Sequence, residues 1–392
     1  MTIVYVSDFD LRGSGYMNIA VSMCTGLVEQ HGRDVIALGF GYDGREHHHP
    51  FKIVPSKPQL VPDMVRLLGQ QEVDIEAIVV ALDIPLQEAL MRKVQVPGEI
   101  PYIGLFPVEG PPVTMSWAMQ LARMDQALVM SRFGQKALAD AGVQATYVPI
   151  GVNCAQWRPP VENERIMIRE GLGIPDDVFM VLTVADNQER KNLSVAMEIF
   201  AHFSLDVEET DQYGHILSAT PKRPTQWHLV TRPESPIGFK LNDLAMDMQV
   251  MDRLVLYNRG MPFKALWSLF VAADAFLLTS KAEGLAMPVL EAMACRLPVV
   301  GTDTCAIHEH LTSGRGLLIK PGYLMIDPWG NSQRALADRD AGVRALERLA
   351  DMDTDKREAM LDKAQGYVQK RTWDKAVNVL NEAIDQAVRS KQ

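Results

Sequence analysis

The stretch Glu283-Gly-Leu-Ala-Met-Pro-Val-Leu-Glu291 places two carboxylates eight residues apart around a turn. The apolar run Ala275-Phe-Leu-Leu-Thr-Ser280, which precedes it, predicts a buried strand. Pro288 suits the first position of a helix, because its ring already fixes a helical φ and its missing N–H is no loss there. The segment therefore predicts a strand, a turn and a helix in succession.

The start of this expected helix suits an anion, because the free N–H groups and the positive end of the helix dipole attract negative charge. Glu283 and Glu291 would repel an anion if they faced it. We expect them instead to accept hydrogen bonds from the hydroxyl groups of a sugar or ribose beside a phosphate. The alternative is an ordinary βα turn, since acidic residues are favoured near any helix start.

Composition describes an acidic globular chain. Its 392 residues suggest two domains, and 47% are hydrophobic and 22% charged. A net charge of −10 argues against a broad nucleic-acid surface and against electrostatic binding to acidic membranes. No apolar run reaches about 18 residues, so we expect no transmembrane helix. Four scattered cysteines and an N-terminus without a basic segment indicate a cytoplasmic protein with reduced thiols.

Alternating strand and helix patterns predict an α/β fold with parallel sheets covered on both faces by helices. A Pro- and Gly-rich stretch at 148–160 divides the series, and the polar segment 204–225 predicts a long surface loop or hairpin. The last stretch, from Trp373 to about Arg389, has the spacing of an amphipathic helix. The expected strands are Ile3–Val6, Val35–Leu38, Ile75–Leu82, Tyr102–Phe106, Ala127–Val129, Phe179–Val184, Trp227–Thr231, Arg253–Leu256, Ala275–Leu278 and Val299–Gly301.

A second motif, Asp186-Asn-Gln-Glu-Arg-Lys-Asn192, follows the expected strand that ends at Val184. The adjacent cations Arg190 and Lys191 suit a diphosphate, because arginine offers a planar fork and lysine a point charge. The alternative is a solvated charge cluster that opens a surface helix. Ligands of doubly wound sheets bind beyond the carboxyl ends of the strands, which is where this motif and the Glu283 turn lie.

The Glu283–Glu291 motif, with Pro298-Val-Val-Gly301 after it, and the Asp186–Asn192 motif resemble the retaining family-4 glycosyltransferases of the GT-B fold. The resemblance implies that Glu283 contacts the donor sugar and that Glu291 holds the nucleotide ribose. It implies that Lys191, with Arg190, neutralises the donor diphosphate. It also places Asn187 and Asn258 near the donor, and the diphosphate at the backbone amides of residues Gly284, Leu285, Ala286 and Met287.

The glycine-rich segment Arg12-Gly-Ser-Gly-Tyr16 follows the first strand. Gly13 and Gly15 allow close approach of a ligand, and in the resembling family such a loop reaches the donor phosphate. A dinucleotide fingerprint would need a third glycine where Asn18 stands, so an oxidoreductase is the least favoured class. A tight βα turn is an equal alternative.

The chain departs from the family pattern at two places. The family's arginine six positions before the lysine is replaced by Ala185, and no histidine follows the strand that ends at Phe106. We expect Arg190 to replace the former, and Glu109 and Asp83 to line the acceptor side. Neither His47-His-His49 nor His308-Glu-His310 has the spacing of a convincing metal site, so we expect no metal and no cofactor.

The resemblance implies a GT-B fold with two doubly wound Rossmann-like domains and a cleft between them. Residues 1–155 would bind the acceptor, residues 160–370 the nucleotide-sugar donor, and the helix 371–392 would return to the first domain. The implied activity is transfer of a sugar from a UDP- or GDP-linked donor to an unknown acceptor, with retention of configuration. We expect no nucleic-acid partner and consider a homo-oligomer possible. A same-fold epimerase or phosphorylase and a non-catalytic nucleotide-sugar-binding module remain as alternatives.

Overall fold

The computed structural model describes residues 1–10, 15–93, 100–235, 237–328 and 330–392. The chain forms two compact units. Unit 1 contains Met1–Gly151, Asp327–Ser332 and Arg371–Gln392, and unit 2 contains Val152–Ile326 and Gln333–Lys370. Gly13 lies outside the described residues, so its expected role stays a prediction.

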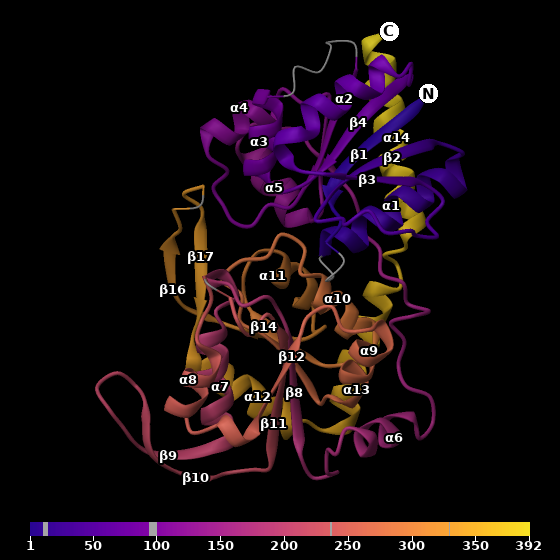
Figure 1. The fold of residues 1–392 in the computed structure, drawn as a ribbon. Helices are drawn as coiled ribbons and strands as arrows, with labels where there is room; N and C mark the ends of the chain where they lie inside the picture. The colour runs from indigo at the N-terminus through magenta and orange to yellow at the C-terminus, as the bar shows by residue number, and fades with distance from the viewer. Residues whose placement is uncertain (11–14, 94–99, 236, 329) are drawn as a thin grey trace. The chain divides into compact units, whose positions relative to one another are not determined.

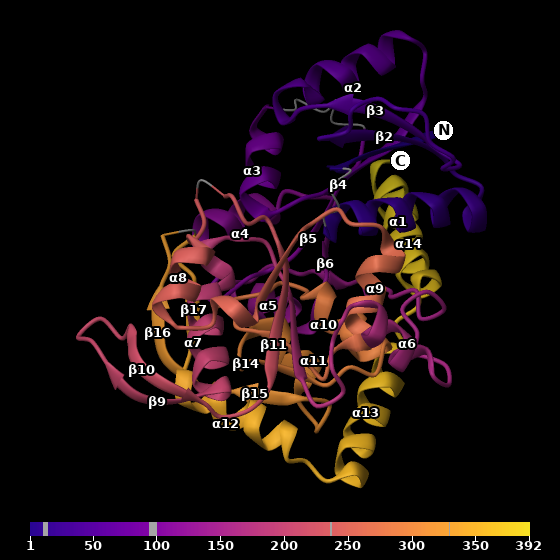
Figure 2. The same cartoon turned by 60° about the horizontal axis from the view of Figure 1, so that its bottom comes forward.

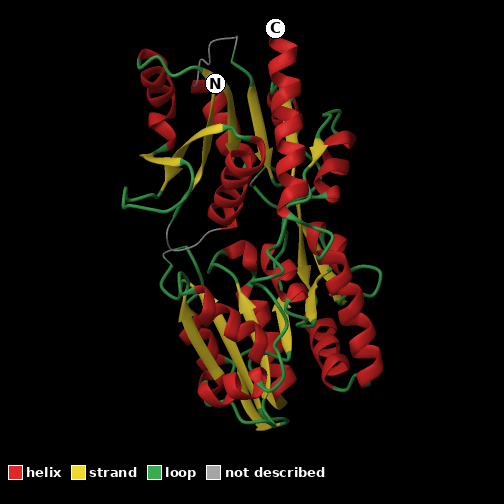
Figure 3. Ribbon diagram, turned by 90° about the vertical axis from the view of Figure 1, so that its right-hand side faces the viewer, coloured by secondary structure: helices red, strands yellow, loops and turns green. Residues whose placement is uncertain are grey.

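Unit 1 is built on a parallel sheet of seven strands in the order β3-β2-β1-β4-β5-β6-β7. Helices flank the strands of this sheet; Figure 3 colours helices red and strands yellow. The strands are β1 (Thr2–Asp8), β2 (Asp34–Phe40), β3 (Lys52–Ser56), β4 (Ile75–Ala81), β5 (Tyr102–Phe106), β6 (Gln126–Val129) and β7 (Thr146–Tyr147). The helices are α1 (Gly15–His31), η1 (Pro58–Leu60), α2 (Val61–Gln70), α3 (Ile84–Lys93), α4 (Met115–Leu121), α5 (Arg132–Asp140) and α14 (Trp373–Lys391).

Unit 2 is built on a parallel sheet of six strands in the order β12-β11-β8-β13-β14-β15. These strands are β8 (Phe179–Val184), β11 (Thr225–Thr231), β12 (Leu254–Asn258), β13 (Ala275–Leu278), β14 (Val299–Thr302) and β15 (Leu317–Ile319). The helices are α6 (Glu164–Gly171), η2 (Glu189–Lys191), α7 (Leu193–Ser204), α8 (Leu241–Asp247), η3 (Met251–Arg253), α9 (Phe263–Ala272), α10 (Met287–Ala294), α11 (Cys305–Leu311), α12 (Arg339–Ala350) and α13 (Thr354–Val368).

Two antiparallel hairpins extend from unit 2. The segment 204–225, for which a long surface loop or hairpin was expected, forms a hairpin of strands β9 (Leu205–Thr210) and β10 (Ile216–Pro221), which project from the body of the unit (Figure 2). Strands β16 (Pro321–Ile326) and β17 (Gln333–Ala337) form the second hairpin, which the sequence pattern did not reveal. The expected doubly wound α/β architecture is confirmed in both units.

The C-terminal helix α14 completes the core of unit 1, although it is the last element in the chain (Figure 1). Its apolar face packs on α1 and on strands β4, β5 and β6, and the Val377 and Leu380 side chains are fully buried. Arg33, just after α1, donates to Glu76 at 2.8 Å, to Asn381 at 2.9 Å and to Asp385. Apolar burial and a part-buried ion network therefore both hold α14 in place.

No helix in the described part of the chain is long and apolar enough to cross a membrane.

Packing of α14 on α1 depends on the absence of a side chain at Gly26, since a Cβ there would lie 2.5 Å from Val377 Cγ2. Valine is β-branched and cannot rotate clear in a helix. We predict that Gly26→Ala lowers the free energy of unfolding by about 1–3 kcal/mol, measured by urea denaturation. This loss would exceed the gain of about 1 kcal/mol that alanine brings to a helix.

The control is Gly69→Ala in α2, where an added Cβ meets no atom within 4 Å. That variant should be as stable as the unmodified protein or slightly more stable. Equal stability of the two variants would contradict the proposed contact between α1 and α14.

Candidate active site

Glu283 lies in the turn between β13 and α10 and is only 6% exposed. Lys191 Nζ approaches its Oε1 at 2.5 Å, and Arg190 Nη1 approaches its Oε2 at 3.2 Å. Arg190 also donates to the carbonyl oxygen of Ala282 at 2.7 Å. The structure thus brings together the three residues for which the sequence predicted catalytic roles.

The parallel pairing of β8 with β13 produces this arrangement. Parallel strands end at the same edge of a sheet, so the loops that follow them are neighbours. The 3-10 turn η2 (Glu189–Lys191) is held against the end of β13, because Lys281 N donates to Arg190 O at 2.9 Å. Thr279 Oγ1 donates to the carbonyl oxygen of Asn192 at 3.0 Å. Asn192 itself adopts a left-handed conformation with φ of 54° and leads into α7.

The two cations keep Glu283 ionised. Burial alone would favour the neutral acid, but the charge of Lys191 and then that of Arg190 outweigh it and hold the pKa of Glu283 at about 2. The carboxylate is therefore charged throughout the neutral range. A buried carboxylate held by two cations can orient a polar ligand and can stabilise positive charge that develops beside it.

The turn after Glu283 presents backbone donors. Within the described residues, no acceptor is recorded for the N–H groups of Gly284, Leu285, Ala286 and Met287. Ala286 has φ of 57°, a left-handed conformation that reverses the chain into α10. The turn is fixed from outside, because Ala306 N donates to Glu283 O at 3.1 Å and His310 Nε2 lies 2.6 Å from Leu285 O. Such a fixed set of donors at a helix start suits an anion.

Glu291 lies on α10 and differs sharply from Glu283 in its surroundings. It is 6% exposed, and no described residue forms a hydrogen bond or ion pair with its carboxyl group. Burial therefore raises the pKa of Glu291 to about 8. An unsatisfied buried carboxyl group costs free energy, and a ligand hydroxyl would relieve that cost.

Further cations follow the neighbouring strands, and the sequence reasoning missed them. Arg232, directly after β11, donates to Asp186 at 3.0 Å, and Arg259, directly after β12, donates to the same carboxylate at 2.7 Å. The signal available was a single arginine after each strand, which is weaker than the Arg190–Lys191 pair. Lys281 is buried and pairs with Glu189 beside the same edge of the sheet.

Asn187 and Asn258 differ in their surroundings. The buried amide of Asn187 donates to Phe239 O at 2.8 Å and accepts from Phe239 N at 2.8 Å. Its side chain therefore fixes the loop around Phe239, and a direct contact with the donor stays a prediction. Asn258 ends β12 at the carboxyl edge of the sheet and is exposed.

Three of the expected site residues that the structure describes belong to unit 1. Asp83 follows β4 and accepts a hydrogen bond from Tyr16 Oη at 2.6 Å. Glu109 follows β5, and Gly15 is exposed at the start of α1. Their expected roles toward acceptor and donor stay predictions.

The histidines of the His308-Glu-His310 segment serve hydrogen bonds. His310 is buried between Leu285 O and Tyr367 Oη, while His308 Nδ1 lies 2.5 Å from Asp303 Oδ1. Among the described residues, no three His, Cys, Asp or Glu side chains are grouped so that they could hold a metal ion.

Comparison with known proteins finds similarity in sequence over part of the chain and similarity of fold over the whole of it. Residues 164–327 match the model of the family Glycosyl transferases group 1. The alpha-galactosylglucosyldiacylglycerol synthase of Streptococcus pneumoniae is 25% identical over 188 residues, which is 46% of this chain and 44% of that protein. The D-inositol 3-phosphate glycosyltransferase of Acidothermus cellulolyticus is 28% identical over 208 residues, which is 50% of this chain and 41% of that protein. The chain thus matches less than half the length of each of these relatives.

The fold resembles that of solved glycosyltransferases over the full chain. HepE from Anabaena, determined in complex with UDP-glucose, superposes with a TM-score of 0.71 and 15% sequence identity, covering 100% of both chains. This chain has the GT-B fold, as the resemblance in the sequence implied.

The raised pKa of Glu291 predicts a specific dependence of stability on pH. Between its unfolded pKa near 4.5 and its folded pKa of about 8, the unfolded chain has lost the proton that the folded chain retains. Stability from this group therefore falls as pH rises through that window. As pH rises from 6 to 8, the free energy of unfolding of Glu291→Gln should increase by about 2 kcal/mol relative to that of the unmodified protein. Urea denaturation at each pH measures this difference.

The matched control is Glu234→Gln, which changes an exposed glutamate in the same unit. Its stability difference from the unmodified protein should not change with pH. A Glu291→Gln difference that is equally flat would show that Glu291 is ionised in the folded protein.

Proposed function

We propose that this chain is a retaining glycosyltransferase with a nucleotide-diphospho-sugar donor. It has the GT-B fold, and its second unit carries the match to Glycosyl transferases group 1. The observation that carries the proposal is the Lys191–Glu283–Arg190 cluster beside the donors of residues 284–287. Cations and peptide N–H groups suit a diphosphate, and the carboxylate suits a sugar.

The cations act on the leaving group. As the acceptor oxygen bonds to the anomeric carbon, the bond from that carbon to the diphosphate oxygen breaks. Negative charge then grows on the diphosphate, where Lys191, Arg190 and the amides of residues 284–287 stabilise it. Preorganised donors of this kind lower a barrier because they need no rearrangement during the reaction. The proton of the acceptor hydroxyl passes to a phosphate oxygen, on the same face of the sugar, which gives retention.

The two glutamates take different roles in this proposal. Glu283 is ionised, so it accepts hydrogen bonds from the sugar hydroxyls and stabilises positive charge on the sugar ring. Glu291 is buried without a partner among the described residues, and it bonds the ribose hydroxyls of the nucleotide. Because ribose binding satisfies this carboxyl group, nucleotide binding should stabilise the fold.

The chain supplies the positive charge that the diphosphate needs, so we propose a metal-independent reaction. The donor is UDP- or GDP-linked, and UDP-glucose is the first to test because HepE, of the same fold, was determined with it. The acceptor is not identified by the residues of either unit.

A second candidate is a non-catalytic nucleotide-sugar-binding module. Two departures from the family pattern favour it. Ala185 stands where the family has an arginine six positions before the lysine, and no histidine directly follows the strand that ends at Phe106. A same-fold epimerase or phosphorylase is a third, and assays for UDP-sugar isomers and for phosphate-dependent release distinguish it.

Loss of the cluster should abolish turnover. We predict that Lys191→Ala and Glu283→Ala each lower UDP release from UDP-glucose by about 100-fold or more, as expected when a charge-stabilising group is removed. The control is Lys222→Ala, which removes a lysine paired with Glu347 near the β9–β10 hairpin and should leave the rate within about twofold.

UDP release that is unchanged in both variants would refute the site. UDP binding without turnover of any nucleotide sugar, measured by titration calorimetry beside the release assay, would favour the binding module instead.

Chelation tests the absence of a metal requirement. We predict that the rate of UDP release is the same after dialysis against EDTA as before it, since Lys191 and Arg190 carry the charge that a cation would supply. A rate lost with EDTA and restored by Mg²⁺ or Mn²⁺ would contradict this prediction.

A further inference from the structure

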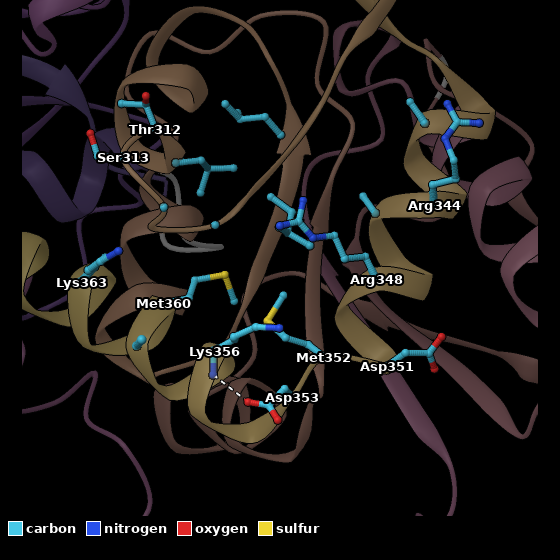
Figure 4. A pocket seen from close by; sticks show the side chains of 18 residues that line it. Thr312, Ser313, Arg344, Arg348, Asp351, Met352, Asp353, Lys356, Met360 and Lys363 are labelled. Atoms are coloured by element: carbon cyan, nitrogen blue, oxygen red, sulfur yellow. Dashed lines mark hydrogen bonds between the residues drawn. The ribbon is translucent and has the colours of Figure 1, made fainter.

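A groove of about 950 Å³ lies between helices α12 and α13 of unit 2 (Figure 4). Part of its lining is apolar and comes from the end of α11 and the start of β15, including Leu311 and Leu317. Its volume is within the range of small-molecule sites. Met352 and Met360 add adaptable apolar surface.

Four cations also line this groove, although the chain as a whole has a net charge of −10. Arg344 and Arg348 come from α12, one turn apart, and Lys356 and Lys363 come from α13, two turns apart. At 1.5 Å per residue, these spacings are about 6 Å and about 10 Å. One phosphate cannot contact all four cations, so the groove suits a ligand with several separated negative charges.

Three of these four cations have no carboxylate partner among the described residues, whereas Arg344 is close enough to Asp340 to help Arg339 lower the pKa of that carboxyl group. Within the described residues, no ion pair or side-chain hydrogen bond is recorded for Arg348, Lys356 or Lys363. The Asp353 carboxylate accepts from the backbone N–H groups of Asp355 and Lys356, where it caps α13. In Figure 4 the Asp351 carboxylate points away from Arg348 and Lys356.

The groove is separate from the candidate active site. It contains Gly316 and Leu317, at the amino end of β15, whereas Glu283 and Lys191 follow the carboxyl ends of β13 and β8. All strands of this sheet are parallel, so the two sites lie at opposite edges of it.

We propose that the groove between α12 and α13 binds a small organic anion that carries two or more phosphate groups and an apolar portion. Arg344 and Arg348 hold phosphate oxygens with their planar forks, and Lys356 and Lys363 neutralise charge from the opposite wall. The apolar portion lies on Leu311, Leu317 and Met360. This site does not depend on the proposed transferase activity.

The test uses inorganic tripolyphosphate as the probe and titration calorimetry at 50 mM NaCl. The chain that carries Lys191→Ala alone is compared with the chain that carries Lys191→Ala and Arg348→Gln/Lys356→Gln. The Lys191→Ala change in both proteins weakens anion binding at the candidate active site and keeps its contribution equal. The groove substitutions should weaken binding at least tenfold. Binding should also weaken as NaCl is raised to 200 mM, because it is electrostatic.

The matched control is Lys52→Gln/Lys57→Gln, which removes two exposed lysines from unit 1 and changes the net charge equally. It should bind within twofold of the background protein, and all variants should melt at the same temperature. Equal affinity in all three proteins, or no binding at 50 mM NaCl, would overturn the proposal. Binding to vesicles containing phosphatidic acid without binding to tripolyphosphate would assign the groove to a membrane surface instead and would also overturn it.

Discussion

The ion pair between Lys191 and Glu283 is the interaction on which the functional part of unit 2 depends. It joins the loops after two neighbouring parallel strands, β8 and β13, in a place where neither charge is well solvated. Removal of one partner would leave the other buried with less compensation, which is costly. Arg190 adds a second cation, which helps to keep the carboxylate charged.

Glu283 and Glu291 show that environment, rather than residue type, sets acidity. They are eight residues apart and equally buried, yet one has a pKa of about 2 and the other of about 8. The difference follows from partners: two cations contact the first, and no described residue pairs with the second. The segment from Glu283 to Glu291 thus offers a ligand both a fixed negative charge and a carboxyl group that still needs a hydrogen bond.

Much of this arrangement could be predicted from sequence, because long buried strands and paired motifs leave clear patterns. The ten expected strands are all present, and the Glu283–Glu291 turn has the predicted form. Short elements left too little periodicity: β15 has three residues, and the exposed strand β16 is paired only with β17. Arg232 and Arg259 were missed because a lone arginine after a strand is common. The hydrogen bonds between the Asn187 amide and the Phe239 backbone join distant segments of the chain, which no local pattern encodes.

The place of α14 in unit 1 has a consequence for synthesis of the chain. Strands β1 to β7 leave the ribosome first, but their helical cover on β4, β5 and β6 arrives only with the last twenty or so residues. Every residue of unit 2 is therefore translated before unit 1 can close its core. During that interval the apolar surface that α14 later covers is exposed on the nascent chain.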